Sequence, residues 1–393
     1  MKIKAPLVMS EGTRLQNQVI TVQNGLIENI EPASTMDHYD WELDPHSILI
    51  PGLIDLHIHG IKGHDVMDGT PNSLSMISKT LAEEGVTGFL ATTMTESIAR
   101  IEAAIDNSVY CQKNNRDYHG AEILGLHLEG PFLSTEFMGA QCGIHLLQPN
   151  PLLLEAWQKR SAGSIKILTL APELPQALEL IDTAKKLGIV ASLGHTAASF
   201  NETLTAIDRG ATHATHLFNA MRGIHHRTPG AAAALLMDER MTAEIIVDGL
   251  HIAPEMIRFI FQLKKHSQLV LVTDAMSAKC LKNGEYVFGG QTVILKDQEA
   301  RLKKNGALAG STLCLNQALK NAHQYTGIAL EKLIPLATSI PAKILKMNQQ
   351  IGSISQGKKA NFAVLNQDLE VQVTMREGRV VYKKPGVAQS LPD

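Results

Sequence analysis

Short apolar runs alternate with segments of helical periodicity through most of the chain. Residues 54–58 form the first strand-like run. Leu74, Ile77 and Leu81 then recur at the i, i+3, i+7 spacing of a single helix face, and Gly85 stands where that helix would end. The pattern therefore predicts repeated units of one strand and one helix. Further strands are predicted at residues 86–94, 123–128, 165–170, 189–193, 213–217, 243–247 and 269–273, and further helices at 101–109, 178–187, 198–207 and 254–264.

Eight strands that alternate with helices pair in parallel through right-handed crossovers, and eight is the number of strands that closes a barrel. An open, doubly wound sheet is the competing architecture. Because no G-x-G-x-x-G run follows the first strand, the sequence favours an α/β fold with a (β/α)8 barrel of the TIM type. A β-hairpin at residues 286–295 interrupts the repeat. Helices at residues 313–325 and 330–344 are predicted to complete the barrel.

The two ends of the chain carry a different pattern. Residues 18–23 and 26–30 flank Asn24-Gly25, which is typical of a β-hairpin turn. The last part of the chain is similar, because its β-rich segments are short and Glu377-Gly378 separates two of them. Both ends are therefore predicted to be β structure. The C-terminal strands are predicted at residues 361–365, 370–374 and 379–382.

Composition restricts the class of protein without identifying it. Hydrophobic residues make up 44% of the chain and charged residues 19%, which is typical of a folded globular protein. The 36 Lys and Arg against 39 Asp and Glu give a net charge of −3, so no basic field is expected to attract nucleic acid or an anionic membrane. No apolar run reaches the roughly 18 residues of a membrane span. Neither nucleic acid nor a membrane is therefore expected as a partner.

The expected compartment is the cytoplasm. The N-terminal run MKIKAPLVMSEGT lacks the apolar stretch of a secretory signal peptide. The cysteines stand far apart with no C-x-x-C pair, so they are expected to be buried, reduced thiols. They are Cys111, Cys142, Cys280 and Cys314.

Titratable side chains stand where the predicted strands end, which is the mouth at which barrels of this kind carry their active sites. His57 and His59 are two residues apart in a strand, so both rings point to the same face. His195 and His216 are one strand–helix unit apart, which puts them on adjacent strands. The other strand ends carry Glu129, Glu173, His251 and Asp274.

Imidazole and carboxylate ligands without thiolate suit Zn²⁺, Fe²⁺, Mn²⁺ or Co²⁺, and such an ion activates water and polarises a carbonyl for hydrolysis. Each residue taken alone has an ordinary interpretation. A single strand-end histidine is typically a hydrogen-bonded polar side chain, Asp274 would serve as a helix N-cap, and Glu173 is favoured as a structural hydrogen-bonding group. The repeated placement at strand ends nevertheless favours a metal site.

A cationic cluster stands out in this acidic chain. Arg222, His225, His226 and Arg227 lie close together, and Gly223 with the Thr-Pro-Gly run that follows Arg227 indicates a loop. A planar guanidinium suits bidentate binding of phosphate. On the residues alone, a solvated loop is the favoured interpretation.

Several runs at these positions resemble the amidohydrolase superfamily of metal-dependent barrel hydrolases. The run PGLIDLHIHG at residues 51–60 is shared by many members. EGPF at 129–132, HLFNAM at 216–221 and VDGLH at 247–251 are specific in combination, and they resemble the family of deacetylases that act on N-acetylglucosamine 6-phosphate. The resemblance covers nearly the whole chain. It also includes LHLEGPF at 126–132, SLGHT at 192–196, VTDAM at 272–276 and LAGS at 308–311.

The resemblance implies a metal-dependent enzyme that releases acetate from the acetamido group of this sugar phosphate. It implies one or two divalent ions of Zn, Fe, Mn or Co. Glu129, His195 and His216 would hold the ion common to the family. His57 and His59 vary among members, and their presence here would allow a second ion, with Glu129 bridging the two.

The remaining site residues are also assigned by resemblance. Asp274 would lie near both ions and act as the catalytic acid and base, and His145 would polarise the acetyl carbonyl. Arg227 would reach the substrate phosphate from the neighbouring subunit of a homodimer. The other substrate contacts implied are His145, Asn219, Ala220, His251, Ala309 and Gly310.

The resemblance also implies the domain organisation. Residues 1–50 and 350–393 would form one small β-sandwich beside a barrel of residues 51–349. Two other functions remain open. Another amidohydrolase, such as an N-acyl-amino-acid deacylase, a dihydroorotase or a deaminase, would share the metal and Asp274 but would leave the cationic loop unexplained. A non-catalytic barrel used in assembly would be expected to have lost ligands that are intact here.

Overall fold

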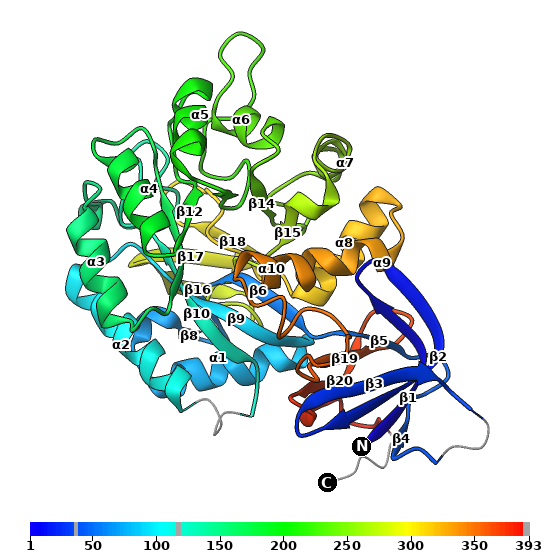
Figure 1. Ribbon diagram of the computed structural model, residues 1–393. Coiled ribbons are helices and arrows are strands. Elements are labelled where there is room, and N and C mark those ends of the chain that lie inside the picture. The colour runs from blue at the N-terminus through cyan, green and yellow to red at the C-terminus, as the bar shows by residue number, and fades with distance from the viewer. Residues whose placement is uncertain (35–37, 115–118, 388–393) are drawn as a thin grey trace.

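The computed structural model describes residues 1–34, 38–114 and 119–387 of the 393-residue chain. A sheet of parallel strands forms the centre, with helices around it (Figure 1). Each strand contacts the next along the chain, as the βα repeat predicts. In spatial order the strands are β6 (Leu53–Ile58), β9 (Val86–Thr93), β10 (Glu122–Glu129), β11 (Ile165–Leu170), β12 (Val190–Leu193), β13 (His213–Ala214), β14 (Thr242–Ile245) and β15 (Leu269–Leu271).

The sheet closes between its first and last strands. Ile58 and Ala275 form a parallel bridge, and the Asp274 N–H donates to the His57 carbonyl at 2.8 Å. The buried Asp55 carboxylate accepts a hydrogen bond from the Thr273 hydroxyl at 2.6 Å across this seam. The barrel predicted from the strand count is therefore confirmed, and its closing seam lies beside the first candidate ligands.

Helices cover the outside of the barrel and bury their apolar faces against it (Figure 1). In α1, for example, Leu74, Ile77 and Leu81 are buried, as their spacing predicts, and the Thr70 hydroxyl caps the helix. The helices are α1 (Pro71–Glu83), α2 (Ile98–Lys113), α3 (Pro151–Arg160), α4 (Ala177–Lys186), α5 (Phe200–Arg209), α6 (Ala231–Met237), α7 (Pro254–Leu263) and α8 (Leu315–Thr326).

Two predicted elements differ in the structure. The strand predicted at 213–217 stops at Ala214, because the backbone turns into the left-handed region at His216, with φ of 30°. The helix predicted at 330–344 is three short pieces: α9 (Leu330–Leu333), a 3₁₀ turn (Ile334–Ala337) and α10 (Ser339–Ile344). Prolines 335 and 341 lie in this segment, and a proline cannot donate the backbone hydrogen bond that a continuous helix requires.

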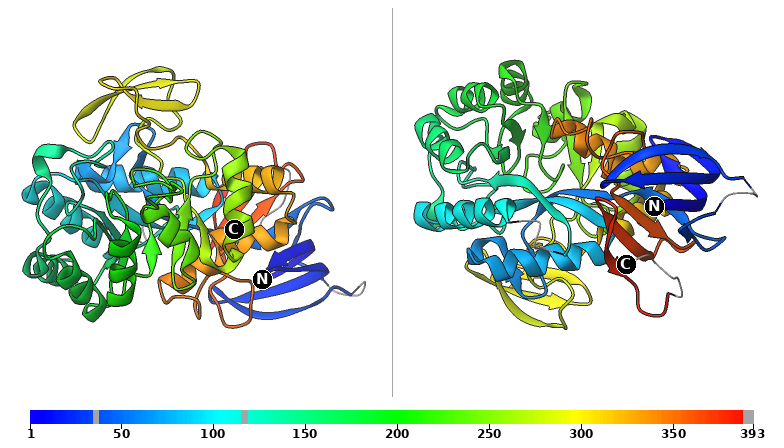
Figure 2. Two further views of the ribbon diagram at one scale, coloured as in Figure 1. Left: turned by 90° about the horizontal axis from the view of Figure 1, so that it is seen from above. Right: turned by 60° about the horizontal axis from the view of Figure 1, so that its bottom comes forward.

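The interruption after β15 is a small sheet rather than a single hairpin. β16 (Gly284–Phe288) and β17 (Gln291–Lys296) form the predicted hairpin, and β18 (Glu299–Leu302) adds a third antiparallel strand. This sheet projects from one side of the barrel (Figure 2). Buried Phe288 and Val293 anchor it to the main core.

The two ends of the chain meet in one further sheet, where β5 (Ile48–Pro51) pairs antiparallel with β19 (Phe362–Leu365). β2 (Thr13–Gln23) is longer than the strand predicted at residues 18–23, and it forms the largest hairpin with β1 (Lys2–Ser10), for which no bounds were predicted. All strands join in one hydrogen-bonded path, in the order β21-β20-β19-β5-β1-β2-β3, with β4 beside β1. The remaining bounds are β3 (Leu26–Pro32), β4 (Trp41–Glu42), β20 (Val371–Arg376) and β21 (Arg379–Lys383).

This terminal sheet has its own apolar core. Trp41 from the N-terminal part and Phe362 from the C-terminal part are both almost completely buried in it. Within the described part of the chain, no helix combines the length and apolar character that crossing a bilayer requires.

Phe362→Ala should destabilise the terminal sheet, because the side chain is 1% exposed and fills the core that both chain ends share. A cavity of this kind costs about 3–5 kcal/mol. Denaturant unfolding followed by circular dichroism measures the loss. Phe259→Ala is the matched control. Phe259 is 37% exposed on α7, so this variant should lose little unfolding free energy. Equal losses in both variants would contradict a core shared by the two ends.

Candidate active site and metal centre

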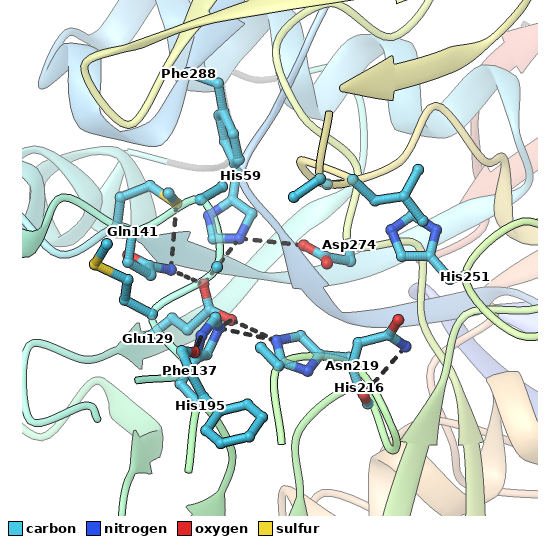
Figure 3. A pocket seen from close by; sticks show the side chains of 18 of the residues that line it. His59, Glu129, Phe137, Gln141, His195, His216, Asn219, His251, Asp274 and Phe288 are labelled. Carbon is cyan, nitrogen blue, oxygen red and sulfur yellow. Dashed lines mark hydrogen bonds and ion pairs between the residues drawn. The ribbon is translucent and has the colours of Figure 1, made fainter. Parts of the chain in front are cut away.

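A cavity of about 600 Å³ opens at the mouth formed by the carboxyl ends of the barrel strands. Glu129 is the last residue of β10, and His59 follows β6 directly. His195 and His216 follow β12 and β13 by a few residues. All of these side chains point into one cluster (Figure 3). The sequence prediction that distant strand ends gather at one place is therefore confirmed for this set.

Glu129 stands between two pairs of histidines. Its Oε1 lies 3.1 Å from His195 Nε2, 3.0 Å from His216 Nε2 and 3.4 Å from His57 Nε2. Its Oε2 lies 3.3 Å from His59 Nε2. The carboxylate is therefore placed to bridge two cation sites, one beside each histidine pair. Groups of potential ligand atoms in mutual reach include Glu129 with His195 and His216, and Glu129 with His57 and His59.

The histidine pairs are arranged as metal ligands rather than as hydrogen-bonding partners. The two Nε2 atoms lie 3.1 Å apart in the His195–His216 pair and 3.2 Å apart in the His57–His59 pair. His195 Nδ1 faces the Phe137 carbonyl at 2.9 Å, so Nδ1 carries the proton and Nε2 presents a lone pair. Where both rings of a pair present a lone pair, a cation is needed between them. Tetrahedral ligands about 2.0–2.1 Å from zinc lie roughly 3.3 Å apart, close to the separations found here.

Asp274 completes the cluster from the closing seam of the barrel. Its Oδ1 lies 3.3 Å from His59 Nε2 and 3.4 Å from His57 Nε2. The side chain also lines the cavity, so it faces both the histidines and the space for a substrate (Figure 3). A carboxylate in this position can contact an ion and exchange a proton with a bound molecule.

Three of the clustered residues have a strained backbone. His195, His216 and Asp274 have φ values of 49°, 30° and 47°, in the left-handed region that residues with a Cβ seldom adopt. Such conformations cost on the order of 1–3 kcal/mol each and persist where the surroundings hold them. Here the strain turns each side chain from the end of its strand into the mouth of the barrel.

The cluster is strongly coupled electrostatically. Burial alone would lower the pKa of His59, but hydrogen bonds to Asp274 and Glu129 raise it to about 9. Burial alone would raise the pKa of Glu129, yet the His57 and His195 imidazoles hold it well below its usual range. The buried carboxylates are therefore stable in their charged form only beside positive charge. Divalent ions on these ligands would supply that charge.

A layer of buried polar groups supports the cluster, and the sequence interpretation missed it. The Glu244 carboxylate lies 2.9 Å from His57 Nδ1. The ring of His127 lies 4.6 Å from that of His57, and burial lowers the pKa of His127 to about 3, so this imidazole is neutral. Gln141 Nε2 donates to Glu129 Oε2, and its Oε1 accepts from the Thr95 N–H at 2.7 Å. Polar residues inside apolar strands, Glu244 and His127, are the sequence signals that could have indicated this layer.

Most of the predicted substrate contacts line the cavity. His251 does so, held by Asp248 Oδ2 at 2.7 Å from its Nδ1, and Asn219, Ala220 and Gly310 do so as well. Gly310 has a φ of 63°, and a Cβ there would lie 3.1 Å from the Asp274 carbonyl oxygen. Only glycine therefore lets this loop pass so close to the catalytic candidate. Ala309 is buried next to it and does not line the cavity.

Two predicted residues are not brought into the cavity. His145 lies on a 3₁₀ turn (Gly143–His145), and its Nε2 is 3.3 Å from Glu96 Oε2, a residue of a smaller neighbouring cavity of about 120 Å³. His145 therefore pairs outside the larger cavity, whereas Gln141 lies beside Glu129. Arg227 lies on the exposed loop before α6, which extends away from the barrel (Figure 1).

Glu173 has the structural role that its residue type favoured. It accepts hydrogen bonds from the Thr196 hydroxyl at 2.5 Å and from the Ala197 N–H at 2.6 Å. It therefore holds the loop that follows His195. The cavity-lining residues that the sequence did not predict include Arg301, from β18, and Phe288, whose ring lies 5.3 Å from that of His59.

Comparison with known proteins identifies the family. A family model for the amidohydrolase family matches residues 48–381. The chain belongs to the amidohydrolase family. The N-acetylglucosamine-6-phosphate deacetylase of Bacillus subtilis is 37% identical over 97% of this chain and 96% of the relative.

Two further proteins extend the comparison. A variant of the N-acetyl-D-glucosamine-6-phosphate deacetylase of Mycobacterium smegmatis, solved in complex with N-acetyl-D-glucosamine-6-phosphate, has a TM-score of 0.92 at 30% identity. It covers 98% of this chain and 99% of its own. The N-acetylgalactosamine-6-phosphate deacetylase of Escherichia coli O157:H7 is 33% identical over 96% of this chain and 98% of the relative. These three relatives are thus named as deacetylases of two closely related sugar phosphates.

Glu129→Gln should weaken metal binding at least 100-fold, because the amide replaces the one carboxylate that faces both histidine pairs. Metal content after dialysis against defined Zn²⁺ or Mn²⁺, measured by plasma mass spectrometry, checks this. Glu84→Gln is the matched control, since Glu84 is a buried carboxylate that pairs with Lys279 and contacts no candidate ligand. Full metal content in the Glu129 variant would refute the bridging site.

Proposed function

We propose that the chain hydrolyses the acetamido group of N-acetylglucosamine 6-phosphate to glucosamine 6-phosphate and acetate, in the catabolism of amino sugars. The observation that carries this proposal is the carboxylate between two histidine pairs, with Asp274 facing both the histidines and the cavity. Membership of the amidohydrolase family and the deacetylases among its relatives support the choice of an amide bond. The substrate bound by the Mycobacterium smegmatis protein supports the choice of sugar.

Glu129, His195 and His216 would hold one divalent ion, and His57 and His59 would hold a second, with Glu129 shared. When bound, such ions polarise the acetyl carbonyl and lower the pKa of water so that it attacks at neutral pH. We propose Zn, Fe, Mn or Co as the metal, with one or two ions bound. The Nε2 separations within both histidine pairs support two sites.

Asp274 is the group that moves the proton. Its carboxylate accepts a proton from the attacking water as the new carbon–oxygen bond forms. It then donates that proton to the departing nitrogen as the carbon–nitrogen bond breaks, which releases the amine and acetate. Contacts with the His57 and His59 imidazoles lower the pKa of Asp274 against the effect of burial, so it begins as the carboxylate. His145 was assigned to the acetyl carbonyl, and its pairing with Glu96 does not support that role.

The far end of the cavity would hold the sugar phosphate. Hydrogen bonding to Asp248 raises the pKa of His251 against the effect of burial, which favours the cationic form of the ring. Asn219, Ala220 and Gly310 line the same cavity, with Ala309 behind. Binding energy from this remote end positions the amide for attack.

We also propose that the enzyme is a homodimer in the cytoplasm. Arg227 does not line the cavity of its own chain, and its exposed loop would place the guanidinium beside the phosphate of a neighbouring subunit. None of the four cysteines forms a disulfide, which supports a reducing compartment, although Cys280 is exposed rather than buried as predicted.

A substrate panel scored for acetate release tests the function. Hydrolysis of N-acetylglucosamine 6-phosphate should exceed that of unphosphorylated N-acetylglucosamine by at least 100-fold in kcat/KM, since a charged anchor contributes several kcal/mol. N-acetylgalactosamine 6-phosphate is the second arm, because one relative acts on that epimer. Preference for an N-acetyl amino acid or a dihydropyrimidine would refute the proposal.

Asp274→Asn should reduce kcat by about 10²–10⁴-fold, since the amide cannot accept the proton of the attacking water. Steady-state kinetics with the sugar phosphate measure this loss. Metal analysis is the control, because the ligands Glu129, His195 and His216 are unchanged and at least one ion should remain. Turnover close to that of the unmodified enzyme would exclude Asp274 as the acid–base group.

Arg227→Ala should raise KM for the phosphorylated sugar by at least 10-fold and leave the poor reaction of the unphosphorylated sugar unchanged. His226→Ala is the matched control on the same exposed loop, where His226 Nε2 lies 2.7 Å from Arg227 Nη1. Sedimentation should show a dimer in all three proteins. An equal effect on both sugars would exclude Arg227 as a phosphate ligand.

A further inference from the structure

Glu244 is a carboxylate in the interior of the barrel that the proposed reaction does not use. It lies on β14, its side chain is completely buried, and it is not among the residues that line the cavity. A charge in this position must be fully hydrogen-bonded to be tolerated. Its partners therefore show what the carboxylate is for.

Both oxygens of Glu244 are occupied. Oε2 lies 2.9 Å from His57 Nδ1 and accepts from the His216 backbone N–H at 3.2 Å. Oε1 lies 3.2 Å from Nε2 of His213, whose Nδ1 lies 2.5 Å from the Thr242 hydroxyl. One side chain thus contacts a residue of each histidine pair, but it holds His57 through the ring and His216 only through the backbone.

The ring contact fixes which nitrogen of His57 carries the proton. A carboxylate can only accept, so His57 Nδ1 is protonated and Nε2 presents its lone pair. That Nε2 lies 3.2 Å from His59 Nε2 and 3.4 Å from both Glu129 Oε1 and Asp274 Oδ1. In the other tautomer an N–H would point into the position of the ion, and binding there would be lost.

Among the described residues in contact with His57, His127 cannot replace Glu244. His127 Nδ1 lies 3.1 Å from the Leu56 carbonyl and its Nε2 lies 2.7 Å from the Thr169 hydroxyl, so both nitrogens are already engaged. The ring packs edge to face against His57 and limits its tilt. His127, His57 and Glu244 also lie close enough to form a separate metal site, but no His127 lone pair is free for an ion.

We propose that Glu244 is a positioning residue for the second ion: by holding the His57 ring in one tautomer and orientation, it makes the His57–His59 pair a cation site. The inference rests on the proposed metal dependence and adds the residue that determines occupancy of this pair. The Glu129–His195–His216 site does not depend on it in the same way, because His195 takes its orientation from the Phe137 carbonyl.

Two variants separate the hydrogen bond from the charge. Glu244→Met removes the acceptor at similar volume and should leave one ion per chain in place of two, with the second ion bound at least 10-fold more weakly. Glu244→Gln should keep the second ion, because its carbonyl can accept from His57 and His216 while His213 changes tautomer to accept from the amide. Glu84→Gln, which removes a buried carboxylate elsewhere, should keep both ions.

Metal content by plasma mass spectrometry and Mn²⁺ electron paramagnetic resonance give the readout. Two ions on Glu129 couple magnetically, and a single ion gives an isolated signal. The inference is overturned if the Met variant keeps the coupled pair with unchanged affinity, if it loses both ions together, or if the unmodified protein holds only one. Should the Met variant fail to fold, Glu244→Asp, which draws the carboxylate back from His57, must show the same selective loss.

This experiment is independent of the substrate. Failure of the unmodified enzyme to release acetate would refute the proposed function and leave the metal count to decide the role of Glu244. A normal rate of acetate release, with an unaltered pair of ions in the Met variant, would refute the role of Glu244 and leave the proposed function intact.

Discussion

The structure depends on one buried carboxylate that is surrounded by imidazoles. Glu129 has four histidine nitrogens within 3.4 Å of its two oxygens, in a place that water scarcely reaches. An isolated charge there would be very unfavourable, so the carboxylate and the positive charge around it are stable only together. Because the imidazoles come from three different strand ends, ions bound there in place of the protons would also join distant parts of the chain.

The barrel holds this arrangement by fixing the backbone on both sides of it. His195, His216 and Asp274 leave their strands in the left-handed region, and each is tied there by neighbours. Glu173 holds the loop after His195, Glu244 holds the His216 N–H, and the Asp274 N–H donates to His57 across the closing seam. Strain at a site persists only when it is outweighed in this way. The seam that closes the barrel is therefore also the support of the catalytic candidate.

The sequence predicts the repeat and the ligands well because both follow short-range rules. Strands such as β11 (Ile165–Leu170) are marked by apolar runs, and the ligands stand at fixed offsets from those runs. The sequence predictions fail where the position of a segment or side chain depends on contacts with distant parts of the chain. The proline-broken segment after residue 330 kept a helical spacing of apolar residues, and the loop that carries Gln141 into the cluster and His145 away from it has no periodic pattern. Glu244 became interpretable only once β14 was placed beneath His57.

The cavity combines a rigid end with an end that another chain would complete. Around Glu129 the ligands are oriented largely by buried groups of the same chain, from Glu244 and His127 below to Gln141 beside the carboxylate. His251 also lines the cavity and is held by Asp248, and the guanidinium of Arg227 stands outside on an exposed loop. Chemistry at the acetyl group needs ligand atoms fixed to a few tenths of an ångström, which a closed barrel supplies. Recognition of a phosphate needs mainly a correctly placed charge, which a loop from a second subunit can supply.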